Sequence, residues 1–167
     1  LMELAALTDK LTVEWTPPSD GPERPCVRVL RADGTDTGIA FHGVPGGHEF
    51  NSFVVGLYNA AGPGQSIDPA LAEAIAAIDR PLDLQIVVAL SCTMCPELVI
   101  AAQKIAASNP LVTAKVYDVN HFPELRERYK IMSVPCLIIN KAKEAFGKKT
   151  LGQLLELLAE PEAGQTG

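Results

Sequence analysis

The sequence predicts an α/β fold in which a largely parallel sheet is covered by helices. In the second half of the chain, short apolar segments typical of strands alternate with longer segments that have helical spacing. One of them, 82–90 (LDLQIVVAL), is almost continuously apolar, as a strand buried on both faces must be. In the first half, two alternating segments flank Asp33-Gly34, a strong hairpin signal. The expected architecture is therefore parallel strands joined by helical crossovers, with a hairpin added.

Composition is that of a globular domain. The chain has 167 residues, of which 47% are hydrophobic and 20% charged, so it can bury a core. The formal net charge is −6, and no basic tract is present to hold a phosphate backbone, so nucleic acid is not an expected partner. No apolar run approaches the roughly 20 residues that span a bilayer, and no signal-peptide pattern opens the chain. These features predict no membrane partner and favour a cytoplasmic location.

The first half predicts the end of a helix, three strands and a second helix. Residues 1–10 have leucines at helical spacing, and we interpret them as the end of a helix in a chain that is part of something longer. The strands are expected at 11–15, 26–31 and 39–43. The second helix is expected over 47–61, with Gly62 just past its end. Its apolar face is expected to consist of Phe50, Phe53, Val54 and Leu57.

The second half predicts four helices and four strands in the order helix, strand, helix, strand, helix, strand, strand, helix. The first helix, 68–79, has Asp68 as its N-cap and Pro69 at its first position. The other helices are expected at 95–108, 122–130 and 150–160, and the strands at 82–90, 111–119, 134–140 and 143–147. Residues 161–167 are expected to be a frayed tail.

Cys92 and Cys95 form a Cys-x-x-Cys motif between the buried strand and the helix that follows it. Helix N-terminal amides favour negative charge and lower a thiol pKa from about 8.5 to roughly 3.5–7.5 in such motifs. The thiolate is the species that attacks a disulfide. We therefore predict that Cys92 attacks a partner disulfide and that Cys95, being more buried, resolves the mixed disulfide.

A metal site, a structural disulfide or an inert pair would each account for the motif less well. A zinc site needs four ligands, and the three histidines, His42, His48 and His121, lie far from Cys92 in the sequence. Four cysteines at uneven spacing are too few for a disulfide framework. An inert pair is disfavoured because cysteines at the start of a helix are seldom inert. A metal-binding interaction module and a free-standing glutaredoxin-like enzyme remain the alternatives to a redox relay.

The motif, the element order and a later Val134-Pro135 together resemble a thioredoxin-like fold. Three segments resemble the dithiol domain of the alkyl hydroperoxide reductase F subunit, and more closely homologues in which this module follows the flavoprotein: 41–65 (FHGVPGGHEFNSFVVGLYNAAGPGQ), 89–110 (ALSCTMCPELVIAAQKIAASNP) and 131–140 (IMSVPCLIIN). The chain is thus expected to form two tandem thioredoxin-like units. These are a partial, redox-silent unit at 1–64 and a unit with the Cys-x-x-Cys at 65–160, followed by a tail at 161–167.

The resemblance also implies a function. NAD(P)H would reduce FAD in a thioredoxin-reductase-like flavoprotein, fused or separate, whose dithiol would reduce Cys92–Cys95. This module would then reduce a peroxiredoxin, the alkyl hydroperoxide reductase C subunit, or a thioredoxin-like acceptor during peroxide detoxification. The chain lacks the glycine fingerprints that bind FAD or NAD, so no cofactor is expected in the chain itself.

The resemblance assigns roles to two further residues. Pro135 is expected to be a cis proline that abuts the dithiol and shapes the docking face. Glu49 is expected to lie near the dithiol as a general base, although a carboxylate in the first turn of a helix is also favoured by the helix dipole alone.

The remaining cysteines and the single tryptophan have less specific assignments. Cys136 follows Pro135, where relatives are expected to have a small or hydroxyl residue. It is expected to lie close to Cys92, either as a second disulfide or metal partner or as a small apolar residue at the start of a strand. Cys26, in an RPC that matches VPC at 134–136, is expected to be structural, and Trp15 is placed in a strand.

Overall fold

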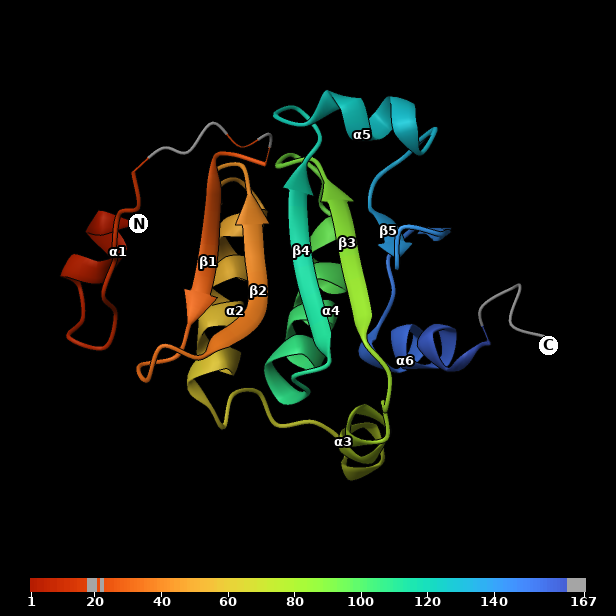
Figure 1. Cartoon of the computed structure of the whole chain (residues 1–167), viewed down its shortest axis with the longest axis horizontal. Coiled ribbons are helices and arrows are strands. Elements are labelled where there is room, and N and C mark those ends of the chain that lie inside the picture. The colour runs from red at the N-terminus through yellow and green to blue at the C-terminus, as the bar shows by residue number, and fades with distance from the viewer. Residues whose placement is uncertain (18–20, 22, 162–167) are drawn as a thin grey trace.

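The computed structural model describes residues 1–17, 21 and 23–161. It contains a six-stranded mixed sheet in the order β1-β2-β4-β3-β5-β6 (Figure 1). The strands are β1 (Cys26–Leu30), β2 (Asp36–His42), β3 (Leu82–Val88), β4 (Val112–Asp118), β5 (Cys136–Ile139) and β6 (Lys143–Phe146). The helices are α1 (Met2–Ala6), α2 (Glu49–Ala61), α3 (Pro69–Ala76), α4 (Cys95–Ser108), α5 (Pro123–Arg128) and α6 (Leu151–Ala159).

Strand pairing follows the expected mixture of crossovers and hairpins. β4 pairs in parallel with both β2 and β3. The remaining pairs, β1 with β2, β3 with β5 and β5 with β6, are antiparallel. Because β2, β3 and β4 all point the same way, the helices that follow β2 and β3 begin at the same edge of the sheet.

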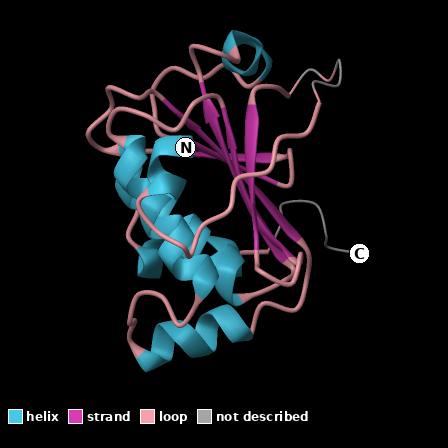
Figure 2. Cartoon of the chain, turned by 90° about the vertical axis from the view of Figure 1, so that its left-hand side faces the viewer, coloured by secondary structure: helices cyan, strands magenta, loops and turns pink. Residues whose placement is uncertain are grey.

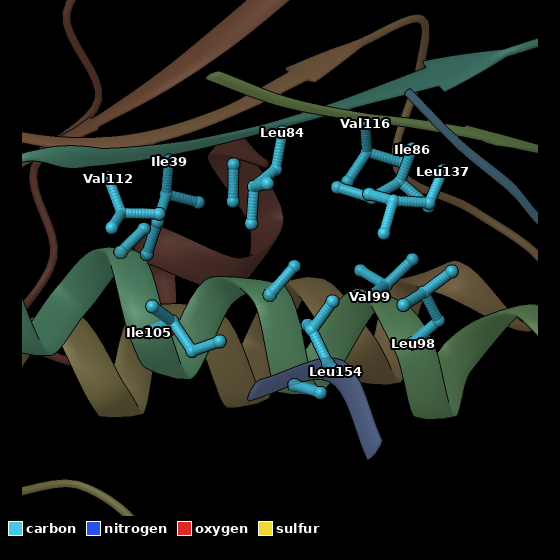
Figure 3. Packing of buried hydrophobic residues seen from close by; sticks show 14 of the residues in the cluster. Ile39, Leu84, Ile86, Leu98, Val99, Ile105, Val112, Val116, Leu137 and Leu154 are labelled. Carbon is cyan, nitrogen blue, oxygen red and sulfur yellow. The ribbon is translucent and has the colours of Figure 1, made fainter. Parts of the chain in front are cut away.

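The main core lies between the sheet and the helices on one face. Leu84 and Ile86 of β3 point toward Leu98 of α4 and are fully buried (Figure 3). Figure 2 shows the stacked helices beside the sheet seen edge-on. A second cluster covers the opposite face and consists of Val87, Tyr117, Val119, Phe122, Ile131, Cys136 and Ile138. No helix within the described ranges is long and apolar enough to cross a bilayer.

The predicted strand at 11–15 is wrong. These residues form no regular structure, and Trp15, which the alternation assigns to that strand, is 82% exposed. Alternating apolar and polar residues favour a strand only where a neighbour supplies hydrogen-bond partners and a surface to pack on. The strand beside β2 is β1, so the alternation at 11–15 finds no such place in the sheet.

The predicted apolar face of α2 is only partly right. Phe53 is buried, but Phe50 is 47% exposed. The side chains that α2 buries are mostly small or polar, namely Glu49, Ser52, Phe53, Gly56, Asn59 and Ala60. The other predicted helices and strands are present with small shifts of their ends. The predicted tail falls at 162–167 outside the described residues, and the division after residue 64 stays a prediction.

Candidate active site

Cys92 and Cys95 lie where β3 gives way to α4 and form a disulfide with a Cα–Cα distance of 5.6 Å. β3 ends at Val88, and a tight turn in which the amide of Cys92 donates to the carbonyl of Ala89 carries the chain to α4. Cys95 is the first residue of α4 and is 0% exposed, whereas Cys92 is half-buried. An incoming thiolate can therefore reach Cys92 more easily than Cys95.

The start of α4 is suited to hold a sulfur anion. Its N-cap residue, Met94, supplies no side-chain hydrogen bond, and Pro96 has no N–H in the first turn. The remaining first-turn amides have no partner from a capping side chain, and they carry the positive end of the helix dipole. These amides favour the ionised form of a thiol placed beside them.

The loop that contains Pro135 closes over the dithiol from the β5 side. The Val134-Pro135 peptide is cis, and the carbonyl oxygen of Val134 lies 3.9 Å from Sγ of Cys92. The structure thus brings Pro135 beside Cys92. A partner that approaches Cys92 must also contact this loop.

Glu49 is the first residue of α2 and is completely buried. Neither of its carboxylate oxygens meets a hydrogen-bond partner among the described residues. Burial raises the pKa of Glu49 to about 7, and the nearby Ser52 hydroxyl offsets part of this effect. A carboxyl group with such a pKa is suited to exchange a proton near neutral pH.

The loop before α2 joins Glu49 to the dithiol segment. The amide of His48 donates to the carbonyl of Leu90, 2.9 Å away and two residues before Cys92. Gly47, with φ of +54°, fits because a Cβ there would lie 2.4 Å from the same carbonyl oxygen. α2 and α4 lie side by side and begin at the same edge of the sheet (Figure 1). Their first residues, Glu49 and Cys95, therefore stand at the same level of the molecule.

Cys136 does not lie where the sequence predicts it. Along β5 the side chains alternate, so Leu137 joins the cluster that contains Cys95 while Cys136 joins the cluster on the opposite face. The expected proximity of Cys136 to Cys92 is therefore wrong. Burial, reinforced by the charge of Glu144, raises the pKa of the Cys136 thiol to about 11, which makes it a small apolar side chain at neutral pH.

Cys26 faces a histidine rather than the dithiol. Its Sγ lies 3.8 Å from Nε2 of His42, whose Nδ1 is 2.8 Å from the carbonyl oxygen of Glu23. His42 stacks on Tyr117 with ring centroids 4.2 Å apart. Burial raises the pKa of Cys26 and lowers that of His42, so the contact joins a neutral thiol and a neutral imidazole. In the part of the chain that the structure describes, no three His, Cys, Asp or Glu residues are grouped to hold a metal ion.

Sequence reasoning missed two buried polar residues near the site. Ser52 on α2 and Gln103 on α4 are both fully buried. The signal for Gln103 was its place in the apolar stretch IAAQKIAAS, eight residues after Cys95. Two turns of helix and about one residue separate these positions, so they lie near one face of α4.

Comparisons with known proteins agree with this geometry. A thioredoxin domain family model matches residues 82–159. The F subunit of alkyl hydroperoxide reductase from Pseudomonas aeruginosa is 34% identical over 98% of the chain, which corresponds to 30% of that protein. An NADH dehydrogenase of Bacillus subtilis is 30% identical over 92% of the chain and 29% of its own length. The chain thus spans less than a third of the curated relatives it matches.

Solved structures extend the similarity to the whole fold. The NTD_N/C domain of the alkylhydroperoxide reductase AhpF from Enterococcus faecalis superposes with a TM-score of 0.89 at 39% identity, covering 95% of this chain and 80% of that one. A protein disulfide oxidoreductase from Aeropyrum pernix gives a TM-score of 0.69 at 22% identity, covering 81% of this chain and 58% of that one. The second likeness concerns the fold alone.

Proposed function

Because this chain belongs to the family of the thioredoxin-fold N-terminal domain of the alkyl hydroperoxide reductase F subunit, we propose that it relays electrons by thiol–disulfide exchange at Cys92 and Cys95. The observation that carries the proposal is the asymmetry of the pair. One sulfur is accessible and the other buried, at the start of a helix that no side chain caps. That arrangement favours attack through Cys92 and resolution through Cys95.

The exchange proceeds in two steps with the dithiol reduced. The Cys92 thiolate attacks one sulfur of a partner disulfide, forming a mixed disulfide and releasing the other partner sulfur as a thiolate. The Cys95 sulfur, once deprotonated, attacks Sγ of Cys92 and releases the second partner thiolate. Two electrons pass to the partner, and the Cys92–Cys95 disulfide is left behind.

Glu49 is the base that we assign to the second step. Cys95 is buried, so water has poor access to its proton, and Glu49 begins the neighbouring helix at the same level. A pKa of about 7 allows the Glu49 carboxylate to accept that proton at neutral pH and release it later. Pro135 contributes to the docking surface around Cys92.

The electron donor and acceptor that we propose follow the family. The donor is a thioredoxin-reductase-like flavoprotein, fused or separate, that takes electrons from NAD(P)H through FAD. The acceptor is a peroxiredoxin or a thioredoxin-like protein, which makes the relay part of peroxide detoxification. We place the relay in the cytoplasm, where thiols are kept reduced. The names of the relatives, an alkyl hydroperoxide reductase and an NADH dehydrogenase, support this direction of electron flow.

The test is reconstitution of the chain with such a flavoprotein, NADH, a peroxiredoxin and peroxide, with NADH consumption as the readout. The wild-type chain should support turnover, and Cys92→Ser should abolish it. The matched control is Cys136→Ser, since that thiol lies on the opposite face of the sheet and should leave turnover unchanged. Turnover in Cys92→Ser at the wild-type rate would overturn the proposal.

Thiol titration separates the relay from the alternatives. Denatured wild-type chain should show two free thiols, Cys26 and Cys136, before reduction and four after it. About one bound zinc or iron per chain would instead support a metal-binding module. A stable glutathione adduct on Cys92 in a Cys95→Ser variant, with turnover driven by glutathione, would support a glutaredoxin-like enzyme.

A further inference from the structure

The interface between α2 and α4 buries a row of polar side chains whose presence the exchange chemistry does not explain. Glu49, Ser52 and Gln103 are each 0% exposed. Five of their polar atoms meet no hydrogen-bond partner among the described residues: both carboxylate oxygens of Glu49, the hydroxyl of Ser52, and both amide atoms of Gln103. Buried polar groups without partners are rare because losing water without compensation is unfavourable. Three of them along one helix pair call for a specific ligand.

The three side chains are aligned along the interface. Ser52 lies three residues and Gly56 seven residues after Glu49, so all three share one face of α2. At Gly56 the two helices approach closely, because a Cβ there would lie 2.6 Å from Oε1 of Gln103. The row therefore runs from Glu49, at the dithiol end, to Gln103, about 10 Å further along the helix pair.

The two helices also match in register. Gly56 is the eighth residue of α2, and Gln103 is the ninth residue of α4. The helices begin at the same edge of the sheet and run side by side, so these residues stand at the same height, as do Glu49 and Cys95 (Figure 1). The polar row thus begins beside the dithiol and continues into the interior.

We propose that Glu49, Ser52 and Gln103, together with buried water, form a hydrogen-bonded chain that controls how readily Glu49 takes up a proton. A serine hydroxyl and a glutamine amide can each donate and accept, so they suit either protonation state of the carboxyl group. A buried water typically makes about three hydrogen bonds and can bridge side chains that do not meet directly. Ser52 and Gln103 are positioning residues that act through Glu49.

The chain of hydrogen bonds opposes the effect of burial. Burial alone favours the neutral carboxylic acid, whereas donors directed at the carboxylate favour its charged form. Removing a donor should therefore make Glu49 hold its proton more tightly. The consequence for Cys95 rests on the proposed function, but the proton affinity of Glu49 can be measured without any redox partner.

The test is the titration of Glu49 by carbon NMR of chain labelled at the glutamate carboxyl carbons. It is carried out in the disulfide form so that Cys95 does not titrate, and the signal is assigned with Glu49→Gln. Gln103→Met, which keeps the length of the side chain and removes its amide, should raise the titration midpoint by about one pH unit. Ser52→Ala should raise it in the same direction.

The matched control is Gln85→Met. Gln85 is also a buried glutamine whose Oε1 has no partner among the described residues, but it alternates with Leu84 and Ile86 and so faces the other side of the sheet. Its substitution should leave the Glu49 midpoint unchanged. Should Gln103→Met disrupt the fold, Ser52→Ala decides, since it removes a single atom.

Two results would overturn the inference. One is an unchanged Glu49 midpoint in folded Gln103→Met and Ser52→Ala. The other is a high-resolution crystal structure in which no water lies within hydrogen-bonding distance of Glu49, Ser52 or Gln103. Unchanged peroxiredoxin turnover in Glu49→Gln is a separate matter: it would remove the base role of Glu49 from the proposed function while the NMR titration still decides the hydrogen-bonded chain.

Discussion

At the scale of single residues, the site depends on two groups kept away from water for different reasons. Cys95 is buried so that only Cys92 meets the partner first. Glu49 is buried at the head of α2, where the helix dipole favours its charged form but the loss of water opposes it. The pKa of about 7 means that the loss of water prevails.

This balance predicts a pH dependence of stability. The pKa of Glu49 is raised on folding from an ordinary value of 4.5 to about 7, so the folded chain binds this proton more tightly than the unfolded chain does. The stability that this group contributes is therefore largest below about pH 4.5. It is lost as the pH rises through 7, by an amount on the order of 3 kcal/mol.

Glu49→Gln should remove that loss. The variant should be more stable than wild type at pH 8 by about 1–3 kcal/mol and close to it at pH 4, as measured by denaturant unfolding at both pH values. Glu97→Gln, on the exposed side of the first turn of α4, is the matched control and should leave the pH dependence as it is. An equal stability difference between Glu49→Gln and wild type at both pH values would contradict the raised pKa.

At the scale of elements, the close approach of α2 and α4 at Gly56 makes a prediction about helix packing. A Cβ at Gly56 would lie 2.6 Å from Oε1 and 2.9 Å from Cδ of Gln103, which is fully buried and cannot move into solvent. Gly56→Ala should therefore destabilise the chain by about 1–3 kcal/mol, despite the better helix propensity of alanine.

Gly152 in α6 provides the matched comparison. A Cβ there would meet only ordinary contacts, the nearest being 3.7 Å away at Cδ2 of Leu71. Gly152→Ala should be neutral or more stable than wild type by up to about 1 kcal/mol, because helix propensity acts without a clash. The two melting curves should shift in opposite directions, and a stabilised Gly56→Ala would show that the helices are not held at this distance.

The elements themselves were largely predictable from the sequence, because their signals are local. The apolar run of β3, the Asp33-Gly34 hairpin and the cap at Asp68 each act within a few residues. The pairing of strands removes one false prediction, at 11–15, since alternation there has no neighbour. The position of Cys136 depends on the alternation of β5 relative to two helix layers, which a single strand does not encode.

The buried polar row was beyond sequence reasoning for a physical reason. Glu49, Ser52 and Gln103 are residue types usually found at the surface, and their burial results from the packing of two helices separated by more than 30 residues in the sequence. The family resemblance indicated Glu49 alone. Ser52 and Gln103 became visible only when the close approach at Gly56 was known.

At the scale of the whole molecule, the sheet passes without interruption across the predicted boundary after residue 64. β2 pairs in parallel with β4, and α2 packs along α4. Pairing and packing of this extent favour a single cooperative unfolding transition for the described chain. Two separately folding units would instead lose their protection against hydrogen exchange independently.

Native-state hydrogen exchange distinguishes these outcomes. Ile39→Val removes one methyl group from a fully buried side chain in β2 and should cost about 1 kcal/mol. If the chain unfolds as one unit, the slowest amides of β3, at Leu84 and Ile86, should exchange about five times faster, as should those of β2. Ile105→Val, the equivalent change in α4, should produce the same pattern. Acceleration confined to the strand pair β1–β2 in Ile39→Val would instead mean that residues 1–64 unfold on their own, and that the relay module consists of two independently stable halves.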